Sequence, residues 1–195
     1  MDRDRLLKIF RRTNALLRGH FELSSGLHSG HYFQCALFLQ HPLYAARVCR
    51  ELALRFRRYR PQVIVGLAVG GVIVAFEAAR HLKARSIFTE REQDVMKFRR
   101  GFELARGERV IIVEDVVTTG DSIREVVTLC RQAGARVMGI GTIVDRSGGR
   151  ATFGRVPFDS LVSLRMESFQ PKQCPLCKEG WPLLKPGSRH EILML

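Results

Sequence analysis

The sequence lacks the motifs of several large nucleotide-binding and membrane classes. It contains no G-x-x-x-x-G-K-[ST] loop, which excludes a Walker A site, and no G-x-G-x-x-G after a strand, which excludes a Rossmann dinucleotide fingerprint. No apolar run reaches the length of about 20 residues that a membrane-spanning helix needs. Residues 1–5 are charged and unlike a signal peptide. We therefore expect a cytoplasmic protein without a membrane partner.

Cysteine is scarce, and its distribution does not suggest a secreted protein. The 195 residues include five scattered cysteines, an odd number that does not describe a disulfide framework. Cys174 and Cys177 form one C-x-x-C pair, which we interpret as paired or free thiols. The alternative is a Cys₄ zinc site built with a second copy across a dimer axis.

The histidines do not show the spacing of a metal site. Neither H-x-x-x-H nor H-E-x-x-H occurs among the histidines at positions 20, 28, 31, 41, 81 and 190. We therefore expect no metal site built from histidine.

Positive charge is abundant and comes mainly from arginine. The net charge is +13, with 26 arginines against 6 lysines. Such a charge suits a nucleic acid, a membrane surface or a polyanionic small molecule. The arginine-rich segment 55–60 falls at the end of a predicted helix, where cations favour the helix dipole. Charge alone therefore does not choose among these partners.

The chain is predicted to form a single domain over residues 1–195, because no linker or internal repeat divides it. Residues 2–18 show the periodicity of an amphipathic helix. Residues 19–34 are rich in glycine, serine and aromatic residues, which indicates short strands and turns covering a site. Pro42 is placed to begin the next helix.

From residue 62 onward, predicted strands alternate with helices. The strands are predicted at 63–65, 86–89, 109–113, 137–144 and 161–164, with helices at 72–82 and 122–133. This alternation predicts an α/β fold with a parallel, doubly wound sheet.

Residues 110–122 form the most informative segment of the chain. Four apolar residues are followed by Glu114 and Asp115, then by a turn rich in hydroxyl groups, and then by a helix that opens at Ser122. The backbone N–H groups and hydroxyls of such a turn can surround a phosphate at the helix N-terminus, and Gly120 permits its close approach. The two carboxylates suit ribose hydroxyls or Mg²⁺. The simpler alternative is an ordinary β-α turn.

Three further segments are predicted to lie at the same edge of the sheet, beyond the carboxyl ends of its strands. The turn 66–71 is built from small residues that expose backbone N–H groups. The polar segment 89–101 is predicted to be a loop whose cations could stabilise a departing anion. Arg146 follows a strand and could clamp a carboxylate, or it could pair with Asp145 instead.

These segments resemble motifs of the type I phosphoribosyltransferases. Residues 110–122 resemble the phosphoribosyl-pyrophosphate (PRPP) signature, residues 66–71 the pyrophosphate loop, and residues 89–101 the mobile catalytic loop. Residues 21–32 resemble the hood motif F-x-L-x-S-G-x-x-S-x-x-Y/F of orotate phosphoribosyltransferases. The tail 174–189 is similar to one branch of that family.

The resemblance implies a type I phosphoribosyltransferase-like parallel sheet flanked by helices, with a small hood contributed by about residues 1–40 and the C-terminal tail. It implies transfer of the phosphoribosyl group from PRPP to orotate in pyrimidine synthesis. Mg²⁺ would be carried mainly by PRPP, without a protein side chain as a predicted ligand. A homodimer would share loop 90–100 between subunits. A purine-base transferase and a nucleic-acid-binding regulator remain the rival hypotheses, although nucleic acid is not the expected partner.

The resemblance also assigns roles to individual residues. The implied catalytic residues are Glu114, Asp115 and Lys97. The implied PRPP-binding residues are Glu114, Asp115, Val116, Val117, Thr118, Thr119, Gly120, Asp121, Ser122, Gly70, Gly71, Arg91, Lys97 and Arg99. The implied orotate-binding residues are Thr118, Arg146, Tyr32 and Phe33.

The chain departs from the family pattern at two cationic positions. Ser24 stands where many members have a lysine, and Val69-Gly70 stands where many have a Tyr-Lys or Arg-Lys pair. We expect Arg91, Lys97 or Arg99 to supply the missing charge.

Overall fold

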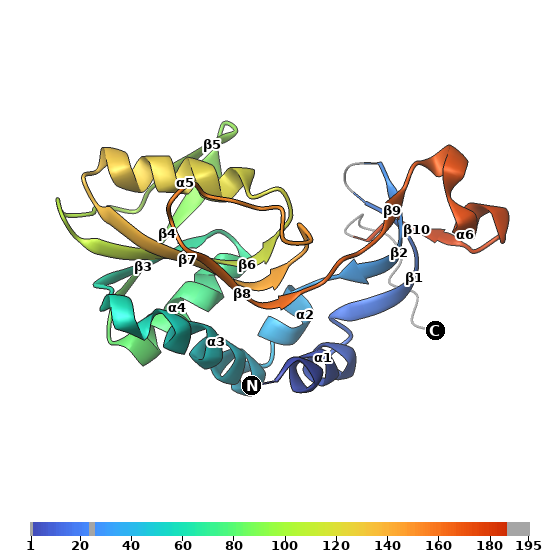
Figure 1. Cartoon of the computed structure of the whole chain (residues 1–195), viewed down its shortest axis with the longest axis horizontal. Helices are drawn as coiled ribbons and strands as arrows, with labels where there is room; N and C mark the ends of the chain where they lie inside the picture. Colours follow the sequence, from blue (N-terminus) through green and yellow to red (C-terminus); the bar gives the residue numbers. More distant parts are fainter. Residues whose placement is uncertain (1, 24–25, 187–195) are drawn as a thin grey trace.

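The computed structural model describes residues 2–23 and 26–186, and it contains two sheets (Figure 1). The larger sheet has the order β5-β4-β3-β6-β7-β8. Its strands are β3 (Val63–Leu67), β4 (Arg85–Glu92), β5 (Val95–Phe98), β6 (Arg109–Val117), β7 (Arg136–Asp145) and β8 (Phe158–Ser163). All neighbouring strands in this sheet pair in parallel except β4 and β5, which are antiparallel.

Helices cover both faces of the larger sheet. The helices α3 (Pro42–Phe56) and α4 (Gly70–Leu82) lie on one side, and α5 (Asp121–Gln132) lies on the other (Figure 1). Side chains of a strand alternate between these two layers, so Ile64 packs with α3 and α4 whereas Val63 and Val65 pack on the α5 side. The prediction of an α/β fold with a doubly wound parallel sheet is therefore confirmed.

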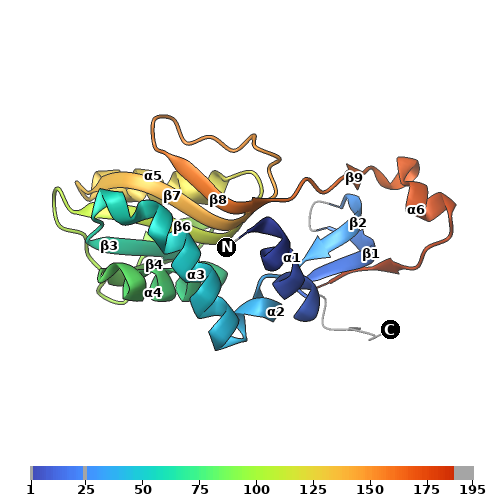
Figure 2. The same ribbon diagram turned by 60° about the horizontal axis from the view of Figure 1, so that its bottom comes forward.

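A second, smaller sheet stands beside the first and pairs strands from the N-terminal and C-terminal parts of the chain (Figure 2). We call it the hood. Its order is β10-β1-β2-β9, with β1 (Leu16–Glu22), β2 (His28–Phe33), β9 (Ser168–Phe169) and β10 (Leu183–Leu184). The remaining elements are α1 (Arg3–Arg12), α2 (Ala36–Leu39), α6 (Pro175–Lys178) and the 3₁₀ turns η1 (Arg57–Tyr59) and η2 (Pro171–Gln173).

Two predicted element boundaries differ most from the structure. The N-terminal helix ends at Arg12 instead of continuing to residue 18, because Asn14 takes a left-handed backbone conformation with φ 53° and the chain then enters β1. Strand β6 continues to Val117 instead of ending at residue 113, so Glu114 is paired with Thr142 inside the sheet. Parallel pairing with β7 extends β6 beyond its apolar residues and includes Glu114.

The predicted loop over residues 89–101 is instead largely a β-hairpin. Strands β4 and β5 pair from Thr89↔Phe98 to Glu92↔Val95 and turn at Gln93 and Asp94, both with positive φ. The alternation that favours a strand was hidden by the many charged side chains of this segment.

Within the described residues, no helix combines the length and the apolar character needed to cross a membrane.

Candidate active site

The turn between β6 and α5 has the form of an anion-binding loop. It surrounds a hollow of about 80 Å³ at the N-terminus of α5, where helix N–H groups lack partners within the helix. The hollow is lined by Glu114 and by residues 116–123. Gly120 precedes the helix with φ 84°, a conformation that favours glycine. The guanidinium of Arg124 donates to the carbonyl of Thr119 at 3.0 Å and to Oδ1 of Asp121 at 2.7 Å, which braces the loop.

The two acids at the end of β6 form a coupled pair. Oε1 of Glu114 accepts from the backbone N–H of Asp115 at 3.0 Å, and Oδ1 of Asp115 accepts from that of Val116 at 2.9 Å. Burial, together with the negative charge of Asp115, raises the pKa of Glu114 to about 10. The pair therefore retains a proton at neutral pH, and can lose it when a cation approaches.

The turn 66–71 packs directly against this pair. A Cβ atom on Gly70 would lie 2.2 Å from Oδ2 of Asp115, and one on Gly71 would lie 3.1 Å from Oε1 of Glu114. Only glycine at position 70 therefore allows the observed approach. The peptide bond between Ala68 and Val69 is cis, and the Val69 side chain is 84% exposed. The turn thus offers backbone groups beside the two acids of β6 to a ligand, but no cation of its own.

Cys35 is a neighbour of the acids that sequence analysis missed. It is buried at the start of α2, and its thiol approaches Asp115. Burial and then the charge of Asp115 raise the pKa of this thiol, so it stays protonated and can donate to the carboxylate. Nothing in the spacing of residues 35 and 115 indicates this contact.

One of the three predicted loop cations lies at the anion-binding loop. Nη2 of Arg91 donates to Oγ of Ser122 at 3.3 Å and to Oε1 of Glu125 at 2.8 Å, which places it at the first turns of α5. Lys97 and Arg99 instead share one partner on the hairpin, Glu92, at 3.0 and 3.3 Å. Among the described residues, no contact joins Lys97 or Arg99 to Glu114 or Asp115.

The guanidinium of Arg146 has no acidic partner among the described residues. Its backbone N–H donates to the carbonyl of Val117 at 2.7 Å, whereas its side-chain Nε is buried and makes no hydrogen bond. The alternative pairing with Asp145 is wrong, because the Asp145 carboxylate accepts instead from the N–H groups of Ser147 at 2.7 Å and Gly149 at 3.2 Å. Burial lowers the pKa of Arg146, because a buried positive charge without a partner is unfavourable. An anionic ligand would therefore stabilise this guanidinium.

The two aromatic residues predicted to contact orotate have different surroundings. Tyr32 is half-buried, lies close enough to Arg146 to interact with it electrostatically, and packs on Phe21 with ring centroids 5.6 Å apart. Phe33 is only 4% exposed and meets Phe10 edge-on in the core, with centroids 4.8 Å apart. Successive side chains of a strand point to opposite faces, so the core placement of Phe33 argues against its predicted contact with orotate. Thr118 is exposed in the anion-binding loop.

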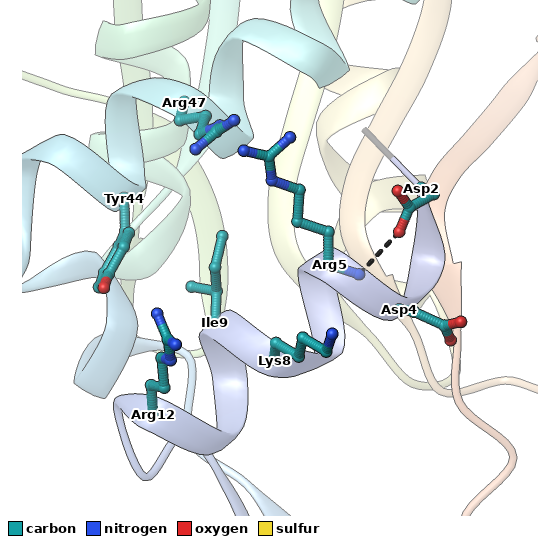
Figure 3. Close-up of a pocket in the computed structure, with 8 residues that line it drawn as sticks. All are labelled: Asp2, Asp4, Arg5, Lys8, Ile9, Arg12, Tyr44 and Arg47. Carbon is teal, nitrogen blue, oxygen red and sulfur yellow. Dashed lines mark hydrogen bonds between the residues drawn. The ribbon is translucent and has the colours of Figure 1, made fainter.

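A second hollow, of about 560 Å³, lies between α1 and α3 (Figure 3). Lys8 and Arg12 on α1 and Arg47 on α3 line it, and Figure 3 shows Asp2 and Asp4 at one end. None of the predicted site residues lines this hollow. Ser24, one of the two departures from the family pattern, and residues 187–189 of the predicted tail motif lie outside the described residues.

The structure brings two of the histidines into a group that their spacing in the sequence did not indicate. His20 and His28 on the hood lie with Cys174 and Cys177, and one potential ligand atom from each of the four lies within 4.8 Å of the others. Motif spacing missed the group because its members are distant in sequence. Both cysteines are free thiols in this structure.

Comparison with known proteins identifies the class that this fold and site define. A family model described as "Phosphoribosyl transferase domain" matches residues 38–152, which include the turn 66–71, both acids and the anion-binding loop. The chain therefore belongs to the phosphoribosyltransferases.

More specific relatives match almost the whole chain. The chain is 53% identical to the orotate phosphoribosyltransferase of Caldanaerobacter subterraneus over 97% of its own length and 99% of that protein. It is 52% identical to that of Thermotoga maritima over 93% and 97% of the two chains. The crystal structure of orotate phosphoribosyltransferase from Aeropyrum pernix aligns with a TM-score of 0.71 at 27% identity, covering 82% of this chain and 94% of that one. The chain belongs to the orotate phosphoribosyltransferase family.

Proposed function

We propose that this protein transfers the 5-phosphoribosyl group from PRPP to orotate, giving orotidine 5′-monophosphate and pyrophosphate in pyrimidine synthesis. Membership in the orotate phosphoribosyltransferase family supports the reaction. The observation that carries the choice of base is Arg146, a guanidinium that has no acidic partner among the described residues and whose Nε is buried without a hydrogen bond. Orotate offers a carboxylate, which a guanidinium can bind through two parallel hydrogen bonds.

The anion-binding loop is proposed to hold the 5′-phosphate of PRPP. The N-terminus of α5 favours negative charge, and residues 118–122 offer backbone N–H groups together with the hydroxyls of Thr118, Thr119 and Ser122. Arg91 lies at Ser122 and can shift to the phosphate if it releases Glu125. This part of the site fixes the ribose in place without taking part in bond breaking.

Glu114 and Asp115 are proposed to act at the ribose. Their oxygens can accept from its hydroxyl groups, and the negative charge of the pair can stabilise positive charge at C1 as pyrophosphate leaves. The orotate nitrogen then attacks C1. Positioning and electrostatic stabilisation supply most of the effect, because the acids form no covalent bond with the sugar.

Mg²⁺ is the cofactor that we propose, carried mainly by PRPP. The site fits such a cation because the acids present hard oxygen ligands, and their coupled proton can be released when positive charge arrives. When bound, Mg²⁺ neutralises the charge of the departing pyrophosphate. The glycine turn 66–71 lies directly against the acids, because residue 70 has no side chain to keep the carboxylate of Asp115 away.

We further propose a cytoplasmic homodimer in which the β4–β5 hairpin serves the neighbouring subunit's site. The hairpin carries Lys97 and Arg99 on a segment at the edge of the sheet, where both cations pair only with Glu92 among the described residues. Exchange of Glu92 for pyrophosphate would give these cations a stronger anionic partner.

A panel of bases tests the proposed substrate. The protein is incubated with PRPP, Mg²⁺ and one of orotate, uracil, adenine, guanine or hypoxanthine, and pyrophosphate release is measured. Orotate should react, while uracil, which has the same ring without the carboxylate, should not react at a comparable rate. Turnover of a purine at the rate of orotate would contradict the proposal. RNA binding across a salt series tests the rival regulator, for which a steep salt dependence at useful affinity is expected.

A further inference from the structure

The hood contains a compact group of four side chains that the phosphoribosyl transfer does not use. His20 comes from β1, His28 from β2, and Cys174 and Cys177 from the segment that includes η2 and α6. His20, His28 and Cys174 are almost completely buried, whereas Cys177 is exposed. Two imidazoles and two thiols at one point form a donor set that is typical of structural zinc sites.

The distances within the group match the edges of a tetrahedron around one ion. The three recorded S···N distances are 3.5 Å from Cys174 to Nε2 of His20, 3.7 Å from Cys177 to the same atom, and 3.3 Å from Cys177 to Nδ1 of His28. Zn–S bonds of about 2.3 Å and Zn–N bonds of about 2.0–2.1 Å place S and N about 3.6 Å apart in a tetrahedron. The N···N distance of 2.9 Å between the two histidines is shorter than an ideal edge of about 3.3 Å, so a small movement would complete the geometry.

The surroundings of His20 prepare it as a ligand. Its Nδ1 lies 3.0 Å from the carbonyl oxygen of Trp181. A ring N–H at Nδ1 donates to this oxygen, which leaves the lone pair of Nε2 facing the other three groups. A hydrogen bond from a ligating histidine to a carbonyl is the usual support for such a site.

The C-terminal arm, residues 164–186, includes β9 and β10 and is held on strands β1 and β2 mainly by short or exposed contacts. Cys174 is the only buried residue of this arm. The arm otherwise meets β1 and β2 through the short pairings of β9 with β2 and of β10 with β1, a hydrogen bond from Oγ of Ser29 to the carbonyl of Glu167 at 2.8 Å, and an exposed ion pair between Lys185 and Glu22 at 2.7 Å. A segment that buries so little apolar surface usually depends on a disulfide or a metal for its order. The four side chains join this arm to strands about 150 positions earlier in sequence, since Cys174 and His20 are 154 residues apart.

We propose that His20, His28, Cys174 and Cys177 bind one structural Zn²⁺ ion within a single chain, and that this ion fastens the C-terminal arm to strands β1 and β2 of the hood. Four protein ligands leave no position for a substrate, so the site is structural. Thiolate and imidazole ligands in a tetrahedral set select zinc over Mg²⁺, which prefers oxygen. The site replaces the two arrangements considered from the sequence, namely thiols without metal and a Cys₄ site shared by two chains.

Two metal-free arrangements are the competing explanations. In the first, Nδ1–H of His28 donates to Nε2 of His20 and both thiols stay free. In the second, Cys174 and Cys177 are joined as a disulfide, which an oxidant would form from their C-x-x-C spacing. Both arrangements leave the protein without a stoichiometric transition metal.

The experiment measures metal in the full chain, purified without chelators or an affinity metal. Zinc content by elemental analysis and the mass of the native protein should both give about one ion per chain, with two thiols protected from a thiol reagent until a chelator is added. Replacement of Zn²⁺ by Co²⁺ should give the intense visible absorption of a tetrahedral site and a thiolate charge-transfer band. These readouts do not depend on enzymatic activity.

Variants identify the ligands. Cys177→Ser and His28→Ala should each lose the ion, whereas His31→Ala should keep it, because His31 is an exposed histidine on the same strand that lies outside the group. Zinc loss should also make the arm 164–186 sensitive to protease while the larger sheet stays folded. If a variant does not fold, the metal content and thiol protection of the unmodified chain still test whether zinc is bound.

Several results would overturn the proposal. Absence of zinc from a folded protein supplied with the metal would do so, as would a native mass two hydrogens lower from a Cys174–Cys177 disulfide. Full zinc binding by His28→Ala, or half an ion per chain, would point instead to a cysteine site between two chains.

Discussion

The carboxylate of Asp115 occupies the place beside Gly70 that any side chain would need: a Cβ atom there would lie 2.2 Å from Oδ2. The glycine turn and the acids of β6 therefore share one small volume, although they belong to separate β-α units. The position of the acid depends on the absence of a side chain in the turn. This relationship connects the two proposed halves of the PRPP site, for ribose and for pyrophosphate.

Replacing Gly70 with alanine should therefore displace Asp115. We expect Gly70→Ala to lower kcat/KM by about tenfold or more, because misplacement of a catalytic group by about 1 Å can cost up to a hundredfold. Pyrophosphate release measures the effect, and thermal unfolding reports on the fold. The matched control is Gly30→Ala, whose new Cβ would have its nearest neighbour at 3.7 Å. Equal losses of activity in the two variants would contradict this explanation.

Removal of the charge from Asp115 should affect catalysis more than stability. Asp115→Asn keeps the shape of the side chain but removes the negative charge proposed to stabilise C1, so kcat/KM should fall by about a hundredfold or more. Asp4→Asn, a change at an exposed residue of α1, should leave kcat/KM unchanged. If Asp115→Asn lost thermal stability in proportion to activity, the residue would have a structural role instead.

Local patterns in the sequence predicted much of the larger sheet and its anion-binding loop. The apolar run before Glu114, the glycine at 120 and the helix after it are all contiguous, and the structure forms them as one β-α unit. The hairpin at 90–100 was mistaken for a loop because its charged side chains hide the alternation of a strand. Charge pattern alone does not show whether a polar segment is paired.

Contacts between distant segments could not be predicted from local patterns. Cys35, just before α2, approaches Asp115 at the end of β6, and His20 on β1 approaches Cys174 near η2, although each pair is far apart in the sequence. Phe33 was predicted to contact the ligand because it follows Tyr32. Side chains alternate along a strand, however, so Phe33 points into the core. Each of these relations depends on tertiary structure, which a single sequence does not state.

The raised pKa of Glu114 predicts a specific dependence of stability on pH. A carboxylic acid whose pKa rises from the ordinary value of 4.5 to about 10 on folding holds its proton more tightly in the folded state. Its contribution is therefore fully present below pH 4.5 and is lost as pH rises towards 10. Glu114→Gln removes this dependence. Between these limits the unmodified protein should lose up to about 1.4 kcal/mol of unfolding free energy per pH unit relative to Glu114→Gln.

Denaturant unfolding at several pH values between 6 and 9 measures this difference. Glu103→Gln is the control, because Glu103 is exposed and should show no such slope relative to the unmodified protein. Parallel stability curves for the unmodified protein and Glu114→Gln would mean that Glu114 is ionised in the folded state at neutral pH.

Arg146 should determine the preference for an anionic base. Arg146→Ala should reduce kcat/KM for orotate by about a hundredfold or more, since a guanidinium–carboxylate pair in a partly buried site contributes several kcal/mol. The slow reaction with uracil should change much less, because uracil has no carboxylate to lose. Arg155→Ala, at an exposed arginine, serves as the control. Equal losses with orotate and uracil would assign Arg146 to the fold or to PRPP.

The last prediction concerns the β4–β5 hairpin and the dimer. If Lys97 acts in the neighbouring subunit's site, a chain with Lys97→Ala and a chain with Asp115→Asn can together form one intact site. Mixing the two inactive variants and allowing subunit exchange should then recover up to about a quarter of normal activity, because half of the dimers are mixed and each has one good site of two. Native mass spectrometry confirms the exchange. A mixture of Lys97→Ala with Arg99→Ala is the control, since both changes remove a proposed cation of the same hairpin and a mixed dimer then has a defective hairpin at each site. An exchanged mixture of Lys97→Ala and Asp115→Asn that stays inactive would place Lys97 in its own chain's site or outside the reaction.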